Sequence, residues 1–146
     1  MIQAACLVLG PLVLVLGTAF LCKMPKDAGR LVSFRPPAYF FSVAWPVLLL
    51  LLGYSLYEAS NRVPHVLLTV LLMAWLPLYA RRMYKEALWL LVVQLFLAFL
   101  ILSQATQAQA LAGSALAAWL VFALLMSAGE MQERAAAACW TSNFLP

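Results

Sequence analysis

The sequence predicts an all-α fold, a bundle of five transmembrane helices that forms a single integral membrane domain over residues 1–146. Of the 146 residues, 66% are hydrophobic and only 9 are basic and 5 acidic, a composition far outside the range of soluble domains. The charged residues also leave long uncharged runs, and about 20 apolar residues are enough to cross the hydrocarbon core of a bilayer. These runs show no alternation of apolar and polar residues, which is typical of the strands of a membrane barrel. Helices therefore remain as the structure that satisfies the backbone hydrogen bonds in lipid.

The first three runs each predict one helix. Residues 2–22 lack the basic start and the small-residue cleavage site of a signal peptide, and therefore form a first span. The second helix, 36–58, begins at the Pro36-Pro37 pair, because proline in a first turn removes no helical hydrogen bond. The third helix covers 63–81. No soluble domain fits between these spans.

The last uncharged run, residues 87–129, is about twice the length that one crossing needs. Polar side chains cluster only at its middle, in SQATQAQ, and this cluster divides the run into helices over 86–104 and 110–131. The fifth helix has a flank of small residues, which allows close approach by a neighbouring helix or by a second protomer. The residues of this flank are Ala110, Gly113, Ser114, Ala117 and Ala118.

Basic residues predict the orientation. With five spans, eight of the nine lysines and arginines lie on one side, and only Arg62 lies on the other. The positive-inside rule then places the N-terminus outside and the C-terminus in the cytosol, with the basic loop 23–35 over the cytosolic mouth of the bundle. The same bias explains the net charge of +4, so no nucleic-acid partner is implied. A mitochondrial outer membrane, a bacterial membrane and a host membrane reached by a viral protein all remain open.

Residues for conventional catalysis or metal binding are scarce. His65 is the single histidine, and the three cysteines have no CxxC spacing. No carboxylate approaches the interior of a span except Glu58 and Glu130, near two span ends, so an ion-driven pump has little support. No cofactor is required by any motif.

Aromatic side chains are the most numerous unusual feature. Tyr39 and Phe40 lie near the start of the second span, where rings commonly form an interfacial belt. Trp45, Trp75 and Trp119 lie deeper in three different spans, and a deep indole N–H needs a partner. Two interpretations remain open for them: packing within the core, or the wall of a pocket for a planar aromatic ligand.

The order and spacing of these residues resemble the translocator protein (TspO/MBR) family, which includes the peripheral benzodiazepine receptor. The family stretch S-W-x-P-P-x-W-V-F-G-P-V-W-x-x-L-Y-x-x-M-G is matched in register by Ser33, Phe34, Pro36, Pro37, Tyr39, Phe41, Trp45, Leu48 and Gly53. WLPLY at 75–79 is similar to W-x-P-x-F of the family's third helix. Trp119, Phe122 and Ala123 match W-x-x-F-A of the fifth. No tyrosine follows Tyr84, so the sterol motif of the animal members is missing.

The resemblance implies five helices around a ligand cavity, often in a homodimer. It implies a receptor for porphyrin or haem and for isoquinoline-type synthetic ligands. The matching ligand-binding positions are Phe41, Trp45, Trp75, Trp119, Ala123 and Met126. Two alternatives remain: a light-dependent porphyrin-degrading enzyme, in which the indoles of Trp45 and Trp119 are the reacting groups, and a facilitator of sterol or lipid transport. A structural partner protein is the least specific possibility.

Overall fold

The computed structural model describes residues 2–23 and 32–144, including all their side chains except those of 38, 108 and 138–144. These residues form helices and connections, with no strand among them. The helices are α1 (Ile2–Cys22), α2 (Ala38–Glu58), α3 (Val63–Ala80), α4 (Tyr84–Ser103) and α5 (Gln107–Phe144). All five are long and apolar enough to cross a membrane, as in a multi-pass membrane protein. The predicted all-α class, with five helices long and apolar enough to span a membrane, is therefore confirmed for the described residues.

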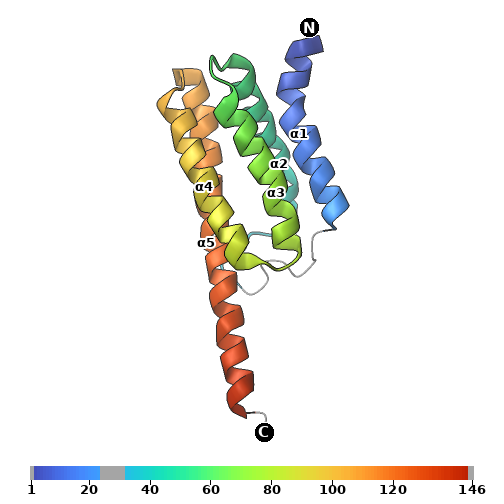
Figure 1. Cartoon of the computed structure of the whole chain (residues 1–146), viewed down its shortest axis with the longest axis vertical. Helices are drawn as coiled ribbons and strands as arrows, with labels where there is room; N and C mark the ends of the chain where they lie inside the picture. Colours follow the sequence, from blue (N-terminus) through green and yellow to red (C-terminus); the bar gives the residue numbers. More distant parts are fainter. Residues whose placement is uncertain (1, 24–31, 145–146) are drawn as a thin grey trace.

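The largest difference from the predicted bounds is in α5. This helix begins at Gln107 rather than at about 110, and it continues past the predicted end of the span near 131 to Phe144. The physical reason is local, because a run of alanines follows Arg134 and alanine has the highest helix propensity. Figure 1 shows α5 continuing well beyond the ends of the other four helices. Most of the predicted loop 23–35 lies outside the described residues.

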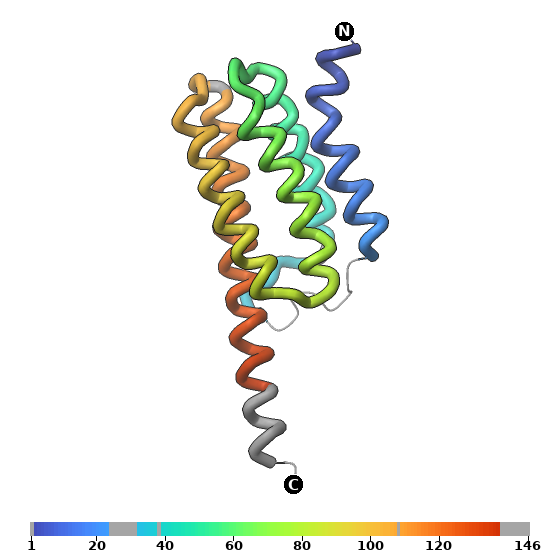
Figure 2. The backbone as a smooth tube through the Cα atoms, viewed as in Figure 1, coloured from blue at the N-terminus to red at the C-terminus, as the bar shows by residue number. Residues whose placement is uncertain are grey.

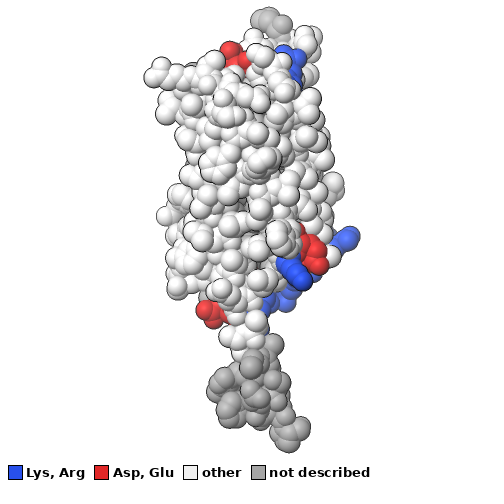
Figure 3. Space-filling view, turned by 60° about the vertical axis from the view of Figure 1, so that its left-hand side comes forward, with Lys and Arg blue, Asp and Glu red and all other residues white. Residues whose placement is uncertain are grey.

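The five helices form a closed ring. Around the ring the order is α1, α2, α5, α4 and α3, and α3 packs against α1 to close it. Helices α2 and α3 are joined by a short connection, but they make only weak contact. The tube in Figure 2 follows this up-and-down path, with the α3–α4 connection at one end and the α2–α3 and α4–α5 connections at the other. We call the end with the α3–α4 connection the cavity end, and the end with the α2–α3 and α4–α5 connections the closed end. On the face seen in Figure 3, charged residues lie near the two ends, and an uncharged band separates them.

Leucines fill the centre of the ring. Apolar burial alone gives little preference for a helix partner over lipid, so packing and polar ties between helices decide which faces meet. One such tie is the amide of Gln94 in α4, which donates to the carbonyl of Leu71 in α3 at 2.9 Å. The most deeply buried leucines are Leu49, Leu68, Leu72, Leu91 and Leu120.

At the closed end the helices touch closely. Gly53 of α2 lies against the backbone of α1, and a Cβ at this position would collide with the carbonyl of Val8. The hydroxyl of Ser55 and Nε2 of His65 are 2.9 Å apart, a buried hydrogen bond that joins α2 to α3. Close contact at glycine and hydrogen bonds between helices both help helices to associate in lipid.

Candidate functional site

A cavity of about 430 Å³ lies within the ring toward the cavity end. Small-molecule sites commonly occupy 300–1,000 Å³ and are lined mainly by apolar and aromatic side chains. Residues of α1, α2, α3 and α5 contribute to this cavity, together with Arg35, which precedes α2. The wall consists of Val15, Leu16, Ala19, Arg35, Phe41, Ser42, Trp45, Pro46, Trp75, Leu76, Tyr79, Trp119, Phe122, Ala123, Met126 and Ser127.

All six residues predicted as ligand-binding lie in this wall. The three deep tryptophans converge there from α2, α3 and α5. The ring centroids of Trp45 and Trp75 are 6.3 Å apart, and those of Trp45 and Trp119 are 5.8 Å apart with the planes at 80°. Phe41 meets Trp119 edge-on at 5.6 Å. Ring pairs at these separations attract one another beyond the area that they bury.

Helical spacing explains why each helix presents its residues together. Residues four apart lie on one face of a helix, so Phe41 and Trp45 share a face of α2. In α3 the same spacing places Tyr79 beside Trp75, and their rings stack with centroids 4.8 Å apart. In α5, Trp119 begins a stripe that continues through Ala123, Met126 and Ser127.

A proline contributes to the wall from inside α2. Pro46 has no N–H, so the carbonyl of Ser42 loses the helical hydrogen bond that it would otherwise accept. Both residues line the cavity, and α2 continues unbroken through them. The carbonyl that loses this helical hydrogen bond therefore belongs to a residue of the cavity wall.

Two of the indoles have an unused donor. The side chains of Trp75 and Trp119 are only 6% and 9% exposed, and neither Nε1 atom has a hydrogen-bond partner among the described residues. Leaving a buried donor unpaired costs about 1–3 kcal/mol. An acceptor on a ligand within reach of either Nε1 would remove this cost.

Sequence reasoning missed part of the wall. Val15, Leu16 and Ala19 of α1 carry no distinguishing signal, because they are ordinary apolar residues in an apolar span. Tyr79 and Ser127 could have been found from their spacing of four and eight residues from Trp75 and Trp119. That spacing follows directly from helical periodicity.

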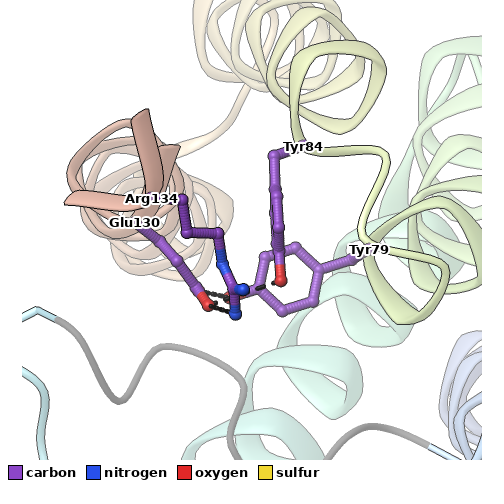
Figure 4. Close-up of polar contacts among 4 residues, drawn as sticks. All are labelled: Tyr79, Tyr84, Glu130 and Arg134. Atoms are coloured by element: carbon purple, nitrogen blue, oxygen red, sulfur yellow. Dashed lines mark hydrogen bonds and ion pairs between the residues drawn. The ribbon is translucent and has the colours of Figure 1, made fainter. Parts of the chain in front are cut away.

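Glu130 was noted in the sequence only for its place near a span end, and it proves to be the centre of a buried polar cluster. Its carboxylate is 0% exposed and accepts from the Tyr79 hydroxyl at 2.8 Å and from the Tyr84 hydroxyl at 3.4 Å. Arg134 donates to the same carboxylate at 3.0 Å. Figure 4 shows these groups meeting from α3, α4 and α5. Because Tyr79 also lines the cavity, the cluster anchors one wall of the site.

A second hollow of about 130 Å³ lies at the closed end. It is small and polar, and the Ser55–His65 pair forms part of its lining. Among the described residues, no group of three His, Cys, Asp or Glu side chains is placed to hold a metal ion. The large cavity, with its flat apolar rings, is the better candidate for a functional site.

Comparisons with known proteins give this site no precedent. No family model, curated protein or solved structure matches the chain. The function must therefore be argued from the site itself.

Proposed function

We propose that this chain is a membrane receptor that binds a planar hydrophobic ligand, a tetrapyrrole such as a porphyrin or haem, between its helices. The supporting observation is the convergence of Trp45, Trp75 and Trp119 around a cavity of about 430 Å³. Flat apolar rings on three helices favour a flat apolar ligand, which gains from stacking and from leaving water. Isoquinoline-type synthetic ligands have the same shape and polarity and are proposed as further ligands.

The translocator protein family remains the proposed origin of this arrangement. Its support is the motif resemblance around Phe41 and Trp45, together with an all-α chain that has five apolar spans. The orientation with the N-terminus outside and the homodimer belong to the same proposal. Membrane lipid would surround the uncharged band.

A titration with protoporphyrin IX in uncharged detergent tests the receptor. We expect protein fluorescence to be quenched with saturation, and the midpoint to rise roughly 10-fold in Trp45→Leu and in Trp119→Leu, since each loses a stacking surface. Trp89→Leu is the matched control, because Trp89 lies on α4, is 64% exposed and is outside the cavity wall. Linear quenching equal to that of protein-free micelles, or equal midpoints in all three variants, would show that the cavity does not bind the porphyrin.

One observation favours a second function. Trp45 and Trp119 are in edge contact at 5.8 Å and both line the cavity, so a bound porphyrin would touch two oxidisable indoles. Light-dependent porphyrin degradation would then appear as loss of the Soret band under illumination in air. The loss should slow in Trp45→Leu and Trp119→Leu but not in Trp89→Leu. An unchanged rate in the first two variants would reject this function and leave the receptor.

A further inference from the structure

Arg35 differs in charge from the rest of the cavity wall. Among the described residues that line the cavity, it is the only one with a charged side chain. It lies just before α2, where its backbone N–H donates to the carbonyl of Val32 at 3.2 Å. Its guanidinium lies 5.9 Å from the ring centroid of Phe41, which also lines the cavity. The cation is therefore held beside the aromatic rings.

The guanidinium has unused hydrogen-bonding capacity. Its Nε is buried and has no hydrogen-bond partner, and Arg35 forms no ion pair with the acidic side chains that the structure describes. Burying a charge is costly unless it is paired and hydrogen-bonded. The contact with Phe41 offsets only part of this cost, because a ring face attracts the cation but supplies no hydrogen-bond acceptor in the plane of the guanidinium. A carboxylate placed against the guanidinium would complete the site.

The buried carboxylate at this end of the bundle is already committed. Glu130 accepts from Arg134, Tyr79 and Tyr84, and it is not part of the cavity wall. Figure 4 shows the Tyr79 hydroxyl turned toward this carboxylate. Among the described residues, the cluster therefore leaves Arg35 without an acidic partner on the cavity side.

We propose that the cavity selects planar apolar ligands that carry a carboxylate, and that Arg35 binds this carboxylate while the indoles hold the ring. This inference rests on the proposed function, since it names the chemical class of the ligand of the same cavity. Guanidinium is suited to the role, because its planar fork can donate two parallel hydrogen bonds to a carboxylate. An ester of the same ring system keeps the stacking surface and loses the charge.

The experiment compares protoporphyrin IX with its dimethyl ester in uncharged detergent, where no anionic lipid competes for Arg35. We expect Arg35→Gln to weaken binding of the free acid roughly 10- to 100-fold, the range for hydrogen bonds to a charged group. Binding of the ester should change by less than about 3-fold. Arg35→Lys should bind the free acid with an affinity between those of the wild type and Arg35→Gln, because lysine keeps the positive charge but lacks the planar guanidinium that donates two parallel hydrogen bonds.

Arg81→Gln is the matched control. Arg81 lies at the same end of the bundle, is exposed and is not in the cavity wall, so its removal subtracts the same charge from outside the site. Raising the salt concentration should weaken acid binding to the wild type more than to Arg35→Gln. Ester binding by Arg35→Gln also reports that this variant still folds.

Three results would overturn the proposal. Equal losses for acid and ester would show that Arg35 supports the ring rather than the carboxylate. Unchanged acid binding in Arg35→Gln, or an equal loss in Arg81→Gln, would show that no specific contact forms. If the proposed receptor function is wrong, the results differ from these. The wild type then binds neither the acid nor the ester, or Trp45→Leu and Trp119→Leu bind the two compounds with the same affinity as the wild type.

Discussion

The two ends of the helix ring are built differently. At the closed end, Gly53 brings the backbones of α1 and α2 into contact, and Ser55 joins α2 to His65 of α3. At the cavity end α2, α3 and α5 carry bulky rings, and a void of about 430 Å³ remains among them. The closed end has only a hollow of about 130 Å³.

Side-chain size explains the difference. A glycine at a crossing removes the side chain that would hold two helices apart, so the backbones can meet. At the cavity end, rings such as Trp45 and Trp119 meet edge-on instead of backbones, and the space beside them stays open. We infer that the closed end holds the bundle together while the cavity end accepts a ligand.

Replacing Gly53 tests the closed end and should have the largest effect. Gly53→Leu places a side chain where Val8 has its backbone carbonyl, and backbone cannot give way as a flexible side chain can. We expect a loss of roughly 3 kcal/mol or more of stability, toward the upper range for overpacking. Thermal unfolding in detergent, followed by size-exclusion chromatography, measures it.

Gly10→Leu and Gly17→Leu in α1 are the controls, because a Cβ at either position meets nothing within 4 Å. They should unfold within a few degrees of the wild type. If Gly53→Leu is as stable as these, the glycine contact does not hold α1 to α2.

Removing the carboxylate of Glu130 tests the anchored wall of the cavity end. Glu130→Leu leaves the hydroxyls of Tyr79 and Tyr84 without their acceptor, and we expect a loss of about 2 kcal/mol of stability. Thermal unfolding in detergent measures the loss. Glu130→Gln retains an acceptor oxygen and should lose less.

The matched control for this cluster is Glu133→Leu, which removes an exposed carboxylate one turn away on the same helix. Equal unfolding temperatures for Glu130→Leu and Glu133→Leu would mean that the cluster contributes nothing to stability.

Filling the cavity tests whether the void is functional. Ala123 lines the cavity, so a phenylalanine at this position should occupy part of the void. We expect Ala123→Phe to weaken protoporphyrin IX binding about 10-fold, equivalent to 1.4 kcal/mol. The contacts of the closed end should keep this variant folded. Ala118→Phe is the control, because Ala118 is exposed on the same helix and outside the wall. Equal binding by both variants would place the ligand elsewhere.

The smallest effect is expected for Ser55→Ala. It removes the hydrogen bond to His65, and such bonds between helices in a membrane contribute about 0.6 kcal/mol on average. The unfolding temperature should fall slightly, and porphyrin binding should be unchanged. A clear loss of binding would mean that the two ends are coupled and do not have separate roles.

Most of the helices could be predicted from the sequence, because crossing a membrane depends on the composition of one continuous segment. The end of α5 could not be predicted from hydropathy, since its last turns past Arg134 depend on helix propensity instead. Of the cavity wall, the deep tryptophans were predicted from their depth and their family resemblance. Val15 and Leu16 were missed because nothing in an apolar helix marks which face meets a void.

The sequence by itself determined that five apolar segments form helices, and that large rings occur deep within three of them. Only the tertiary structure decided that those rings face one another, that Tyr79 reaches Glu130 51 residues away, and that Arg35 lines the same cavity. The reason is physical. Insertion of a helix is a local property of its residues, whereas in lipid the choice of contacting faces depends on how shapes from distant segments fit together.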